Sequence, residues 1–381
     1  MAKRAPANAG KQHKPAGIKE IAAALGVSIG TVDRALHGRP GINPATAARV
    51  LKMAERLGYR PNVAARLLKL NRKLLISVHL PQEIAAFFDL LRNGIRDAAR
   101  AFHSTVELRF RTYPRLGEGD LEALEQALKE PVDGIIMAPG NPRAMGPLIK
   151  TAAQRQIPVV CVATDAPGTE RLTSISADPY TGGAMAAEML ARCVQRPGPV
   201  LVITGDLSVV DHTEKLRGFA ERLSMMRSPL TIVPVLETHD RPAEADRKTR
   251  EAIARYPDLS AVYVATANSL PVLQALQETG HLGRVTVVTT DLFPELVPHI
   301  RSGEVLASVY QRPRTQGRIA FESLYHYLTE RRIPPQRYPL APHLVLQSNL
   351  DLFVEILQSS SDEIAAMEQV PAEKPVARAR R

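Results

Sequence analysis

The sequence predicts an α/β protein in which a small all-α module at the N-terminus precedes a two-lobed body with parallel sheets. Three observations predict this fold class. Residues 1–73 contain fifteen Lys or Arg and three acidic residues, whereas the rest of the 381-residue chain is nearly neutral, so a basic module is attached to a neutral body. From residue 74 onward, short apolar runs alternate with helical stretches, which is typical of βα units. There are eleven such runs, which favours two lobes over one very wide sheet.

Composition excludes several classes of protein. Hydrophobic residues make up 45% of the chain and charged residues 23%, as in folded globular proteins and unlike disordered ones. No apolar run reaches the roughly 18 residues that a membrane helix needs. The basic segment 1–15 lacks the apolar stretch of a secretory signal, so we expect a cytoplasmic protein without a membrane partner. Cys161 and Cys193 lie in an apolar run and a helical stretch, which predicts two buried free thiols and no metal site.

Residues 18–61 have the pattern of three short helices. The first is expected over Ile18–Leu25 and is followed by a glycine that permits a tight turn. Ser28 is a good N-cap for a second helix over Ile29–Leu36, and a third begins at Pro44 directly after a capping asparagine. A helix, a glycine-containing turn and a capped helix form the helix-turn-helix pattern.

The segment from Ile18 to about Lys69 resembles the DNA-binding headpiece of the lac repressor (LacI/GalR) family. The similarity is carried by GVSIGTVDRAL and LGYRPNVAARLL, which match the motifs GVSxxTVxRAL and LGYxPNxxARxL. The resemblance implies that the second helix enters the major groove of double-stranded DNA. Arg34 can pair bidentately with guanine, whereas Gly30 has no side chain with which to read a base. The implied base contacts are Ile29, Gly30 and Arg34, and the implied phosphate contacts or helix caps are Ser28, Thr31 and Asn62.

Residues 62–73 match the family's hinge helix and the basic linker after it. The resemblance implies that Ala65 and Leu68 enter the minor groove, with Leu68 as the wedge that unstacks the central base step. The alternative for Leu68 is a core leucine. Because the leucine heptads that form tetramers in the family are absent from the sequence, we expect a homodimer on a pseudopalindromic operator.

Polar side chains follow the apolar runs of the body, and ligands of parallel sheets bind where the strands end. The sequence has no phosphate-binding glycine loop, no nucleophile elbow and no metal-ligand cluster. We therefore expect a binding protein that is not an enzyme and has neither catalytic residues nor a cofactor. Asp, Asn and Gln side chains suit hydrogen bonding to the hydroxyls of a polyol. The candidates after apolar runs are Asp165, Asp178, His212, Asn268, Asp291 and Gln311.

Residues 74–350 also resemble the effector domain of the lac repressor family and the related periplasmic sugar-binding proteins. The similar blocks are AFFDLLRNGIRDAA, ADPYTGGAMAAEML, NSLPVLQAL and VVTTDLFPELVPHIRSGEVLASVYQRP. The resemblance implies a sugar between two lobes. Its implied contacts are Asn268, Asp291 and Gln311 for the hydroxyls, Phe87 and Phe88 on either side of the ring, and Asp165 as an acid in a nearby loop.

Departures from the family pattern indicate a ligand other than ribose. Lys215 and Thr213 stand where relatives usually have an arginine, Ala138 where an asparagine is common and Thr290 where an aromatic residue is common. His212 and Lys215 would be the partners of a charged or phosphorylated ligand.

Several candidates also have a simpler interpretation. Asp291 and Asn268 could be helix caps, and His212 could lie at the surface. Because Phe87 and Phe88 are adjacent on a helix, we expect one of them to pack in the core and the other to face the cleft.

These patterns together predict a sequence-specific DNA-binding transcriptional regulator. By resemblance it is a repressor of a carbohydrate operon, switched by a small sugar-like effector between the lobes. Two alternatives stay open: a sugar carrier without gene regulation, and a regulator that responds to a sugar phosphate or a non-carbohydrate ligand. The predicted division is a basic disordered tail (1–17), a headpiece (18–61), a hinge helix and linker (62–73), a two-lobed effector-binding and dimerisation domain (74–358) with lobe crossings near 177, 311 and 334, and a flexible tail (359–381).

Overall fold

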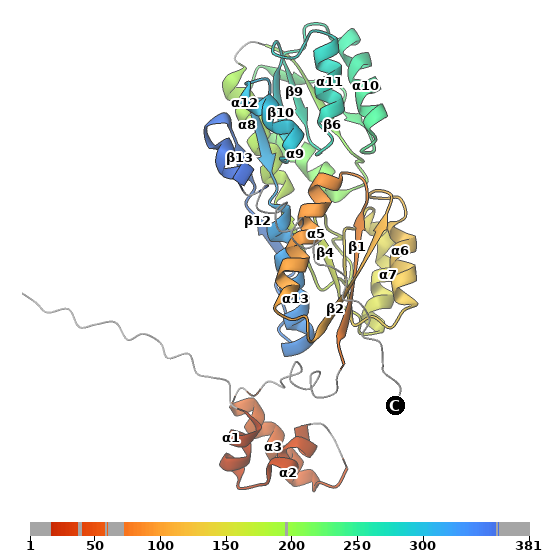
Figure 1. The fold of residues 1–381 in the computed structure, drawn as a ribbon, viewed down its shortest axis with the longest axis vertical. Coiled ribbons are helices and arrows are strands. Elements are labelled where there is room, and N and C mark those ends of the chain that lie inside the picture. Colours follow the sequence, from red (N-terminus) through yellow and green to blue (C-terminus); the bar gives the residue numbers. More distant parts are fainter. Residues whose placement is uncertain are drawn as a thin grey trace, which may run out of the picture. The chain divides into compact units, whose positions relative to one another are not determined.

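The computed structural model describes residues 17–36, 40–57, 59, 72–194, 197–355 and 357. The chain divides into two compact units, one that contains the residues up to Leu70 and a larger one that starts at Asn71 (Figure 1). We call the first the headpiece and the second the body. The N-terminal tail 1–16, the hinge segment 60–71 and the C-terminal segment 358–381 lie outside the described residues, so the expectations for them stay predictions.

The headpiece packs its helices around a small apolar core. Ile21, Val32 and Val50, one from each helix, are fully buried against one another. Ser28 caps the second helix, because its Oγ accepts a hydrogen bond from the backbone N–H of Thr31 at 3.0 Å. A core of this size stabilises a domain only marginally. The helices are α1 (Ile18–Leu25), α2 (Ile29–Leu36) and α3 (Pro44–Arg56), as predicted.

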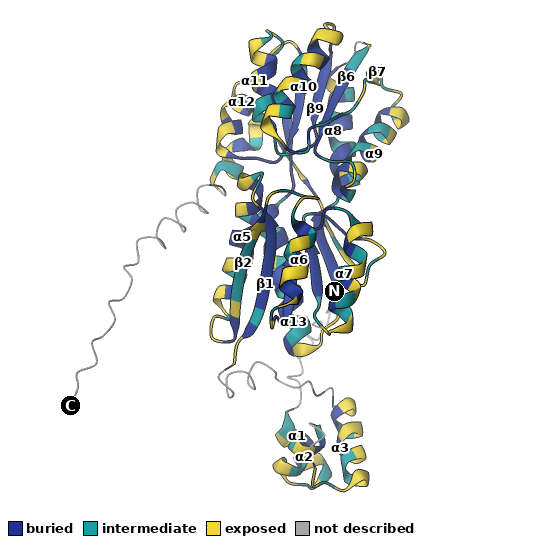
Figure 2. Ribbon diagram, turned by 90° about the vertical axis from the view of Figure 1, so that its right-hand side faces the viewer, coloured by how far each residue is buried: buried dark blue, intermediate teal, exposed yellow. Residues whose placement is uncertain are grey.

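The first half of the body, lobe 1, is built on a six-stranded sheet with the order β12-β5-β4-β3-β1-β2. All its strand pairs are parallel. Its inner strands are buried and the helices around them expose their outer faces (Figure 2), as expected for a sheet covered on both sides. The strands are β1 (Leu74–Pro81), β2 (Val106–Tyr113), β3 (Gly134–Met137), β4 (Val159–Val162), β5 (Thr173–Ala177) and β12 (Arg337–Leu340), and the helices are α5 (Ala85–Arg100), α6 (Asp120–Leu128), α7 (Pro142–Gln154) and α13 (Pro313–Glu330).

The second half, lobe 2, has a sheet with the path β13-β11-β10-β9-β6-β7, and β8 also pairs with β6. Only β13 runs antiparallel to its neighbour in this sheet. The apolar run 231–237 forms two strands, one on either side of Pro234, which cannot donate to a ladder. The strands are β6 (Gly198–Thr204), β7 (Leu230–Ile232), β8 (Leu236–Glu237), β9 (Ala261–Val264), β10 (Thr286–Thr290), β11 (Ala307–Tyr310) and β13 (His343–Val345), and the helices are α8 (Pro179–Cys193), α9 (Val210–Met225), α10 (Pro242–Arg255), α11 (Leu270–Glu278) and α12 (Val297–Arg301), with short 3₁₀ turns η1 (Pro294–Leu296) and η2 (Gln347–Asn349).

The chain passes between the lobes at three places. It enters lobe 2 between β5 and α8 and returns to lobe 1 between β11 and α13. The crossing predicted near 334 is wrong, because β12 still belongs to lobe 1 and pairs with β5. The chain instead crosses at residues 341–342, before β13. β12 contains Pro339 and lies at the edge of the sheet. Because proline cannot donate to a ladder, this residue argued against a strand in the sequence.

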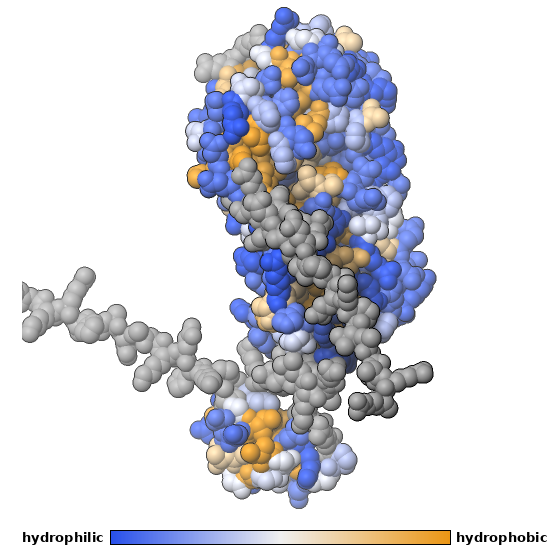
Figure 3. All heavy atoms as spheres, in the orientation of Figure 1, coloured by the Kyte–Doolittle hydropathy of each residue, from blue (hydrophilic) through white to orange (hydrophobic). Residues whose placement is uncertain are grey.

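The cysteines and the surface can be compared with the composition of the chain. Cys161 is buried, but Cys193 is exposed at the end of α8, so the prediction of two buried thiols is wrong for Cys193. Among the described residues, no helix combines the length and apolar character needed to span a bilayer. The visible face is mostly hydrophilic with scattered apolar patches (Figure 3). The exposed large apolar side chains are Ile29, Leu51, Met225, Ile333 and Leu352.

Helices α8 and α9 cross so closely that their backbones are in direct contact. A Cβ atom on Gly183 of α8 would lie 1.9 Å from the carbonyl oxygen of Lys215, and one on Gly218 of α9 would lie 2.0 Å from the carbonyl oxygen of Tyr180. The absence of side chains at the two glycines therefore allows the helices to touch. This contact fixes the position of α9 in lobe 2.

We expect Gly183→Ala to destabilise the body by about 1–3 kcal/mol, because the added methyl group forces α8 away from α9. Gly182→Ala is the matched control, since its Cβ would meet Val309 Cγ1 at 3.6 Å, an ordinary contact, and alanine favours a helix more than glycine does. Urea unfolding followed by circular dichroism measures both free energies of unfolding. Equal stability of the two variants would contradict the helix contact.

Candidate functional site

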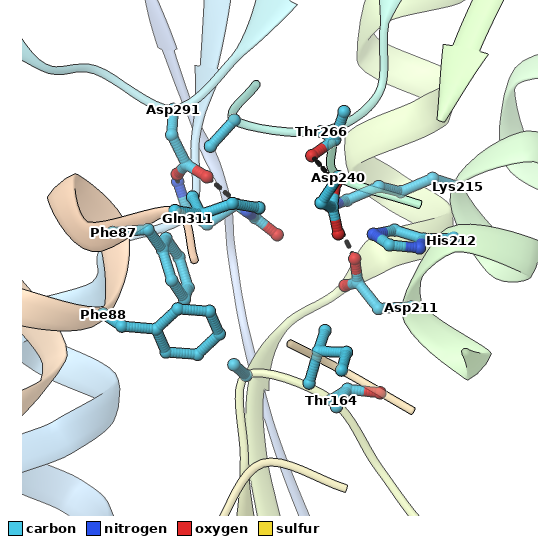
Figure 4. A pocket seen from close by; sticks show the side chains of 14 residues that line it. Phe87, Phe88, Thr164, Asp211, His212, Lys215, Asp240, Thr266, Asp291 and Gln311 are labelled. Atoms are coloured by element: carbon cyan, nitrogen blue, oxygen red, sulfur yellow. Dashed lines mark hydrogen bonds and ion pairs between the residues drawn. The ribbon is translucent and has the colours of Figure 1, made fainter. Parts of the chain in front are cut away.

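A cavity that opens to solvent lies between the two lobes of the body. Small-molecule sites often lie in such clefts between domains. Its walls come from the carboxyl ends of strands in both sheets and from the first turns of α5 and α9 (Figure 4). Six of the eight predicted effector-binding residues line it. The lining is Ile84, Phe87, Phe88, Leu116, Ala163 and Thr164 from lobe 1 and Asp211, His212, Lys215, Asp240, Thr266, Ala267, Asp291 and Gln311 from lobe 2.

Lobe 1 presents a mostly apolar wall. The rings of Phe87 and Phe88 meet edge to face, with their centroids 5.0 Å apart and their planes at 85°. Both rings line the cavity (Figure 4), so the expectation that one of them packs in the core away from the cleft is wrong. Helix α5 begins directly after Ile84, which has a left-handed backbone (φ 54°). The first turn, which carries both rings, therefore lies at the cavity.

Asp291 and Gln311 form the polar centre of the opposite wall. They follow β10 and β11, which are neighbours in the sheet of lobe 2. The backbone N–H of Gln311 donates to Oδ1 of Asp291 at 3.1 Å, and the side-chain amide of Gln311 donates to Oδ2 at 2.6 Å. Asp291 has a left-handed backbone (φ 66°). Its oxygens accept from Gln311, and the 3₁₀ turn η1 that follows has no side-chain cap, so the alternative of a simple helix cap is not supported.

Helix α9 contributes a buried ion pair to the same wall. Nζ of Lys215 lies 2.6 Å from Oδ2 of Asp211, and the two residues are only 3% and 7% exposed. Oδ1 of Asp211 is buried and has no hydrogen-bond partner among the described residues, a condition that costs free energy unless a ligand or water supplies a donor. His212 is buried, and its Nδ1 accepts from the backbone N–H of Asp206 at 2.9 Å. The alternative of a surface histidine is therefore excluded.

Asp240 and Thr164 complete the polar lining. Oγ1 of Thr266 donates to Oδ1 of Asp240 at 2.6 Å. Oγ1 of Thr164 is buried and lacks a hydrogen-bond partner within the described part of the chain. Thr164 in lobe 1 and Asp211 in lobe 2 thus bring unpaired polar atoms to one cavity from opposite sides. A ligand that hydrogen-bonds to both would hold the lobes together.

Two predicted residues do not line the cavity. Asp165 forms a buried two-bond ion pair with Arg171, with Oδ2 at 2.8 Å from Nη2. Because Asp165 is bound to Arg171 and lies outside the lining, its predicted effector contact is not supported. Asn268 follows the lining residues Thr266 and Ala267 but stays outside the lining. Its Nδ2 is buried without a partner among the described residues, and its predicted sugar contact is not supported.

Four polar residues of the lining were not predicted from the sequence. Thr164 and Thr266 follow β4 and β9, and Asp240 follows β8. The rule that polar side chains at strand ends meet the ligand could have found these three. Asp240 was harder to predict, because the strand before it, β8, is only two residues long. Asp211 is the neighbour of the predicted His212, and its role as the partner of Lys215 follows from the i, i+4 spacing on α9.

The start of α2 in the headpiece faces solvent. Ser28, Ile29, Gly30 and Arg34 are exposed, and Ile29 is 51% exposed despite its apolar side chain. Thr31 is half-buried, and its hydroxyl lies 2.9 Å from that of Ser28. The predicted base-reading face of α2 is thus available for contact. The other predicted DNA-binding residues, Asn62, Ala65 and Leu68, lie outside the described residues.

Burial raises the pKa of Asp291 from 3.8 to about 6. Lys215 and the hydrogen bonds from Gln311 oppose this rise, and the carboxylate of Asp211 adds to it. The other ionisable groups that interact with Asp291 are the phenols of Tyr263 and Tyr310, whose pKa values are themselves raised by burial.

We expect the free energy of unfolding of the unliganded protein to fall as the pH rises from 4 to 7, because Asp291 loses its proton in this range. Its folded pKa lies above its unfolded pKa, so the native state binds more protons in this window and the free energy of unfolding falls by up to about 1.4 kcal/mol per pH unit. Other carboxylates have their own pH dependence, so the measured quantity is the difference between wild type and Asp291→Asn in urea unfolding at pH 4, 5, 6 and 7. Parallel profiles of the two proteins would contradict the raised pKa.

Comparison with known proteins identifies both units. Residues 17–62 match the family described as bacterial regulatory proteins, lacI family, and residues 76–332, more than half of the chain, match the periplasmic binding protein domain. The fold of the body is also found in a glucose-galactose binding protein from Geobacillus stearothermophilus, with a TM-score of 0.67 at 24% identity over 73% of this chain and 99% of that chain.

The chain also resembles individual proteins over much of its length. Catabolite control protein A of Priestia megaterium is 27% identical over 69% of this chain and 78% of its own length. The ribose operon repressor of Bacillus subtilis (strain 168) is 26% identical over 71% of this chain and 78% of its own length. The chain belongs to the lacI family of bacterial regulatory proteins, which are DNA-binding transcriptional regulators, and its body is a periplasmic binding protein domain.

Proposed function

We propose that the protein is a sequence-specific repressor whose binding to operator DNA is switched by a small polyol effector in the cavity between the lobes. The observation that carries the proposal is the pair of unpaired buried atoms, Oγ1 of Thr164 and Oδ1 of Asp211, whose residues line one cavity from opposite lobes. A ligand that satisfies both favours one lobe arrangement over the other. Relatives named for ribose and for glucose and galactose support a sugar-like ligand.

The headpiece supplies the DNA contact in this proposal. The exposed start of α2 carries Ile29 and Arg34, an apolar group that suits a thymine methyl and a guanidinium that suits a guanine edge. Two copies of the chain would place two headpieces on the half-sites of a pseudopalindromic operator. Coupling then requires the effector to bind one lobe arrangement more tightly, typically by about 1–3 kcal/mol.

The other two functions raised by the sequence are less well supported. A sugar carrier has no need of a lacI-family headpiece. A sugar phosphate would meet three carboxylates in the lining, whereas the ammonium of Lys215 is already bound to Asp211. An enzymatic role is also less well supported, because the chain resembles a family of regulatory proteins.

We expect Arg34→Ala to weaken binding to a specific operator by about 1–3 kcal/mol, because a bidentate contact to guanine is lost. The operator is first selected from a random duplex library with the wild-type protein. Fluorescence anisotropy at fixed salt then gives the affinities for this duplex and for a scrambled one. Arg34→Lys is the charge-matched control and should keep the non-specific affinity. An unchanged ratio of specific to non-specific affinity in Arg34→Ala would contradict the assignment.

A further inference from the structure

We propose that the effector carries a positive charge on a polyhydroxylated frame, as an amino sugar does. The inference rests on the proposed function, which requires a polyol in the cavity but leaves its charge open.

The charges of the lining do not balance. Three carboxylates, those of Asp211, Asp240 and Asp291, face one ammonium group, that of Lys215. Nζ of Lys215 is bound to Asp211 at 2.6 Å, and no other Lys or Arg belongs to the lining. Nδ1 of His212 lies within hydrogen-bond distance of both the backbone N–H and the carbonyl oxygen of Asp206, at 2.9 and 3.0 Å. Two of the three carboxylates therefore have no Lys or Arg partner in the lining.

A neutral ligand would leave this imbalance in place. Closure of the lobes around it would remove water from the two uncompensated carboxylates, which costs free energy when no opposite charge replaces the water. An anionic ligand would add repulsion. An ammonium group would compensate one of the two carboxylates and supply three donors for charge-assisted hydrogen bonds to carboxylate oxygens.

The geometry indicates where the two parts of such a ligand lie. Asp211 and Asp240 lie together on one side of the cavity, with Oδ1 of Asp211 buried and unpartnered among the described residues (Figure 4). This side suits the ammonium group. Asp291 and Gln311 lie across the cavity, beside the two phenylalanine rings (Figure 4).

That second side accepts the rest of the ligand. The amide and carboxylate suit hydroxyl groups, and the rings of Phe87 and Phe88 suit the apolar face of a sugar ring. The described residues contain no cluster of three side chains able to hold a metal ion, so the acidic groups fit an organic cation and not a metal.

The test compares amino hexoses with their neutral parents. Thermal unfolding of the full chain at pH 7, followed with an extrinsic dye because the sequence has no Trp, is measured with three pairs: D-glucosamine and D-glucose, D-galactosamine and D-galactose, and D-mannosamine and D-mannose. Glucose 6-phosphate is the anionic control. Dissociation constants follow from the dependence of Tm on concentration. We expect at least one amino hexose to bind at least tenfold more tightly than its parent, and no shift with the phosphate.

A matched pair of variants tests the origin of this preference. Asp240→Asn keeps the side-chain size and the oxygen that accepts from Thr266, and should reduce the preference for the amino hexose at least fivefold. Asp246→Asn is the control, because Asp246 lies on α10 outside the lining and pairs with Arg250 at 2.8 Å. This control should keep the preference unchanged.

Two results would overturn the inference in distinguishable ways. If each neutral hexose binds as tightly as its amino form, the charge inference is wrong while a polyol effector stands. If no member of the panel shifts Tm, the amino-sugar inference is wrong, and the operator assay with Arg34→Ala decides separately whether the protein is a sequence-specific regulator.

Discussion

The hydrogen bonds between Asp291 and Gln311 connect the cavity to the chain that joins the lobes. Asp291 ends β10 in lobe 2, and Gln311 is the first residue of the crossing to lobe 1. The carbonyl oxygen of Gln311 in turn accepts from Nε2 of Gln316 at 2.8 Å, within α13 of lobe 1. A ligand that contacts Asp291 or Gln311 therefore acts on the same groups that set the course of the chain between the lobes.

Each lobe also contains a pair of helices in backbone contact. Gly183 and Gly218 bring α8 and α9 together in lobe 2, and a Cβ on Gly94 of α5 would lie 2.0 Å from the carbonyl oxygen of Arg314 in α13 of lobe 1. Such tight pairs resist internal deformation. The ion pair on α9 and the two rings on α5 thus move with their own lobes, and we expect ligand-dependent motion to concentrate at the three crossings.

The sequence predicted what depends on local pattern. The headpiece helices begin and end where caps, glycine and proline place them, and the strands of the body appear as apolar runs, because neighbouring residues determine these features. The cavity residues Asp291 and Gln311 were found from their place at strand ends and from the family resemblance.

The errors concern partners that local pattern does not reveal. Asp165 follows a strand, as the residues that line the cavity do. Its two carboxylate oxygens, however, accept hydrogen bonds from Arg171, six positions later in the chain. β12 contains a proline and is recognisable as a strand only through its pairing with β5. Likewise, the excess of negative charge emerges only when Asp211, Asp240 and Asp291, which come from separate parts of lobe 2, are seen around one cavity.

The most direct test of the account asks whether the cavity and the operator are thermodynamically linked. The affinity of the wild-type protein for its selected operator is measured by fluorescence anisotropy, with and without a saturating concentration of the hexose or amino hexose that gives the largest rise in Tm. The account predicts that the bound compound changes the operator affinity at least about fivefold, in either direction. An operator affinity that stays the same while the compound occupies the cavity would contradict it.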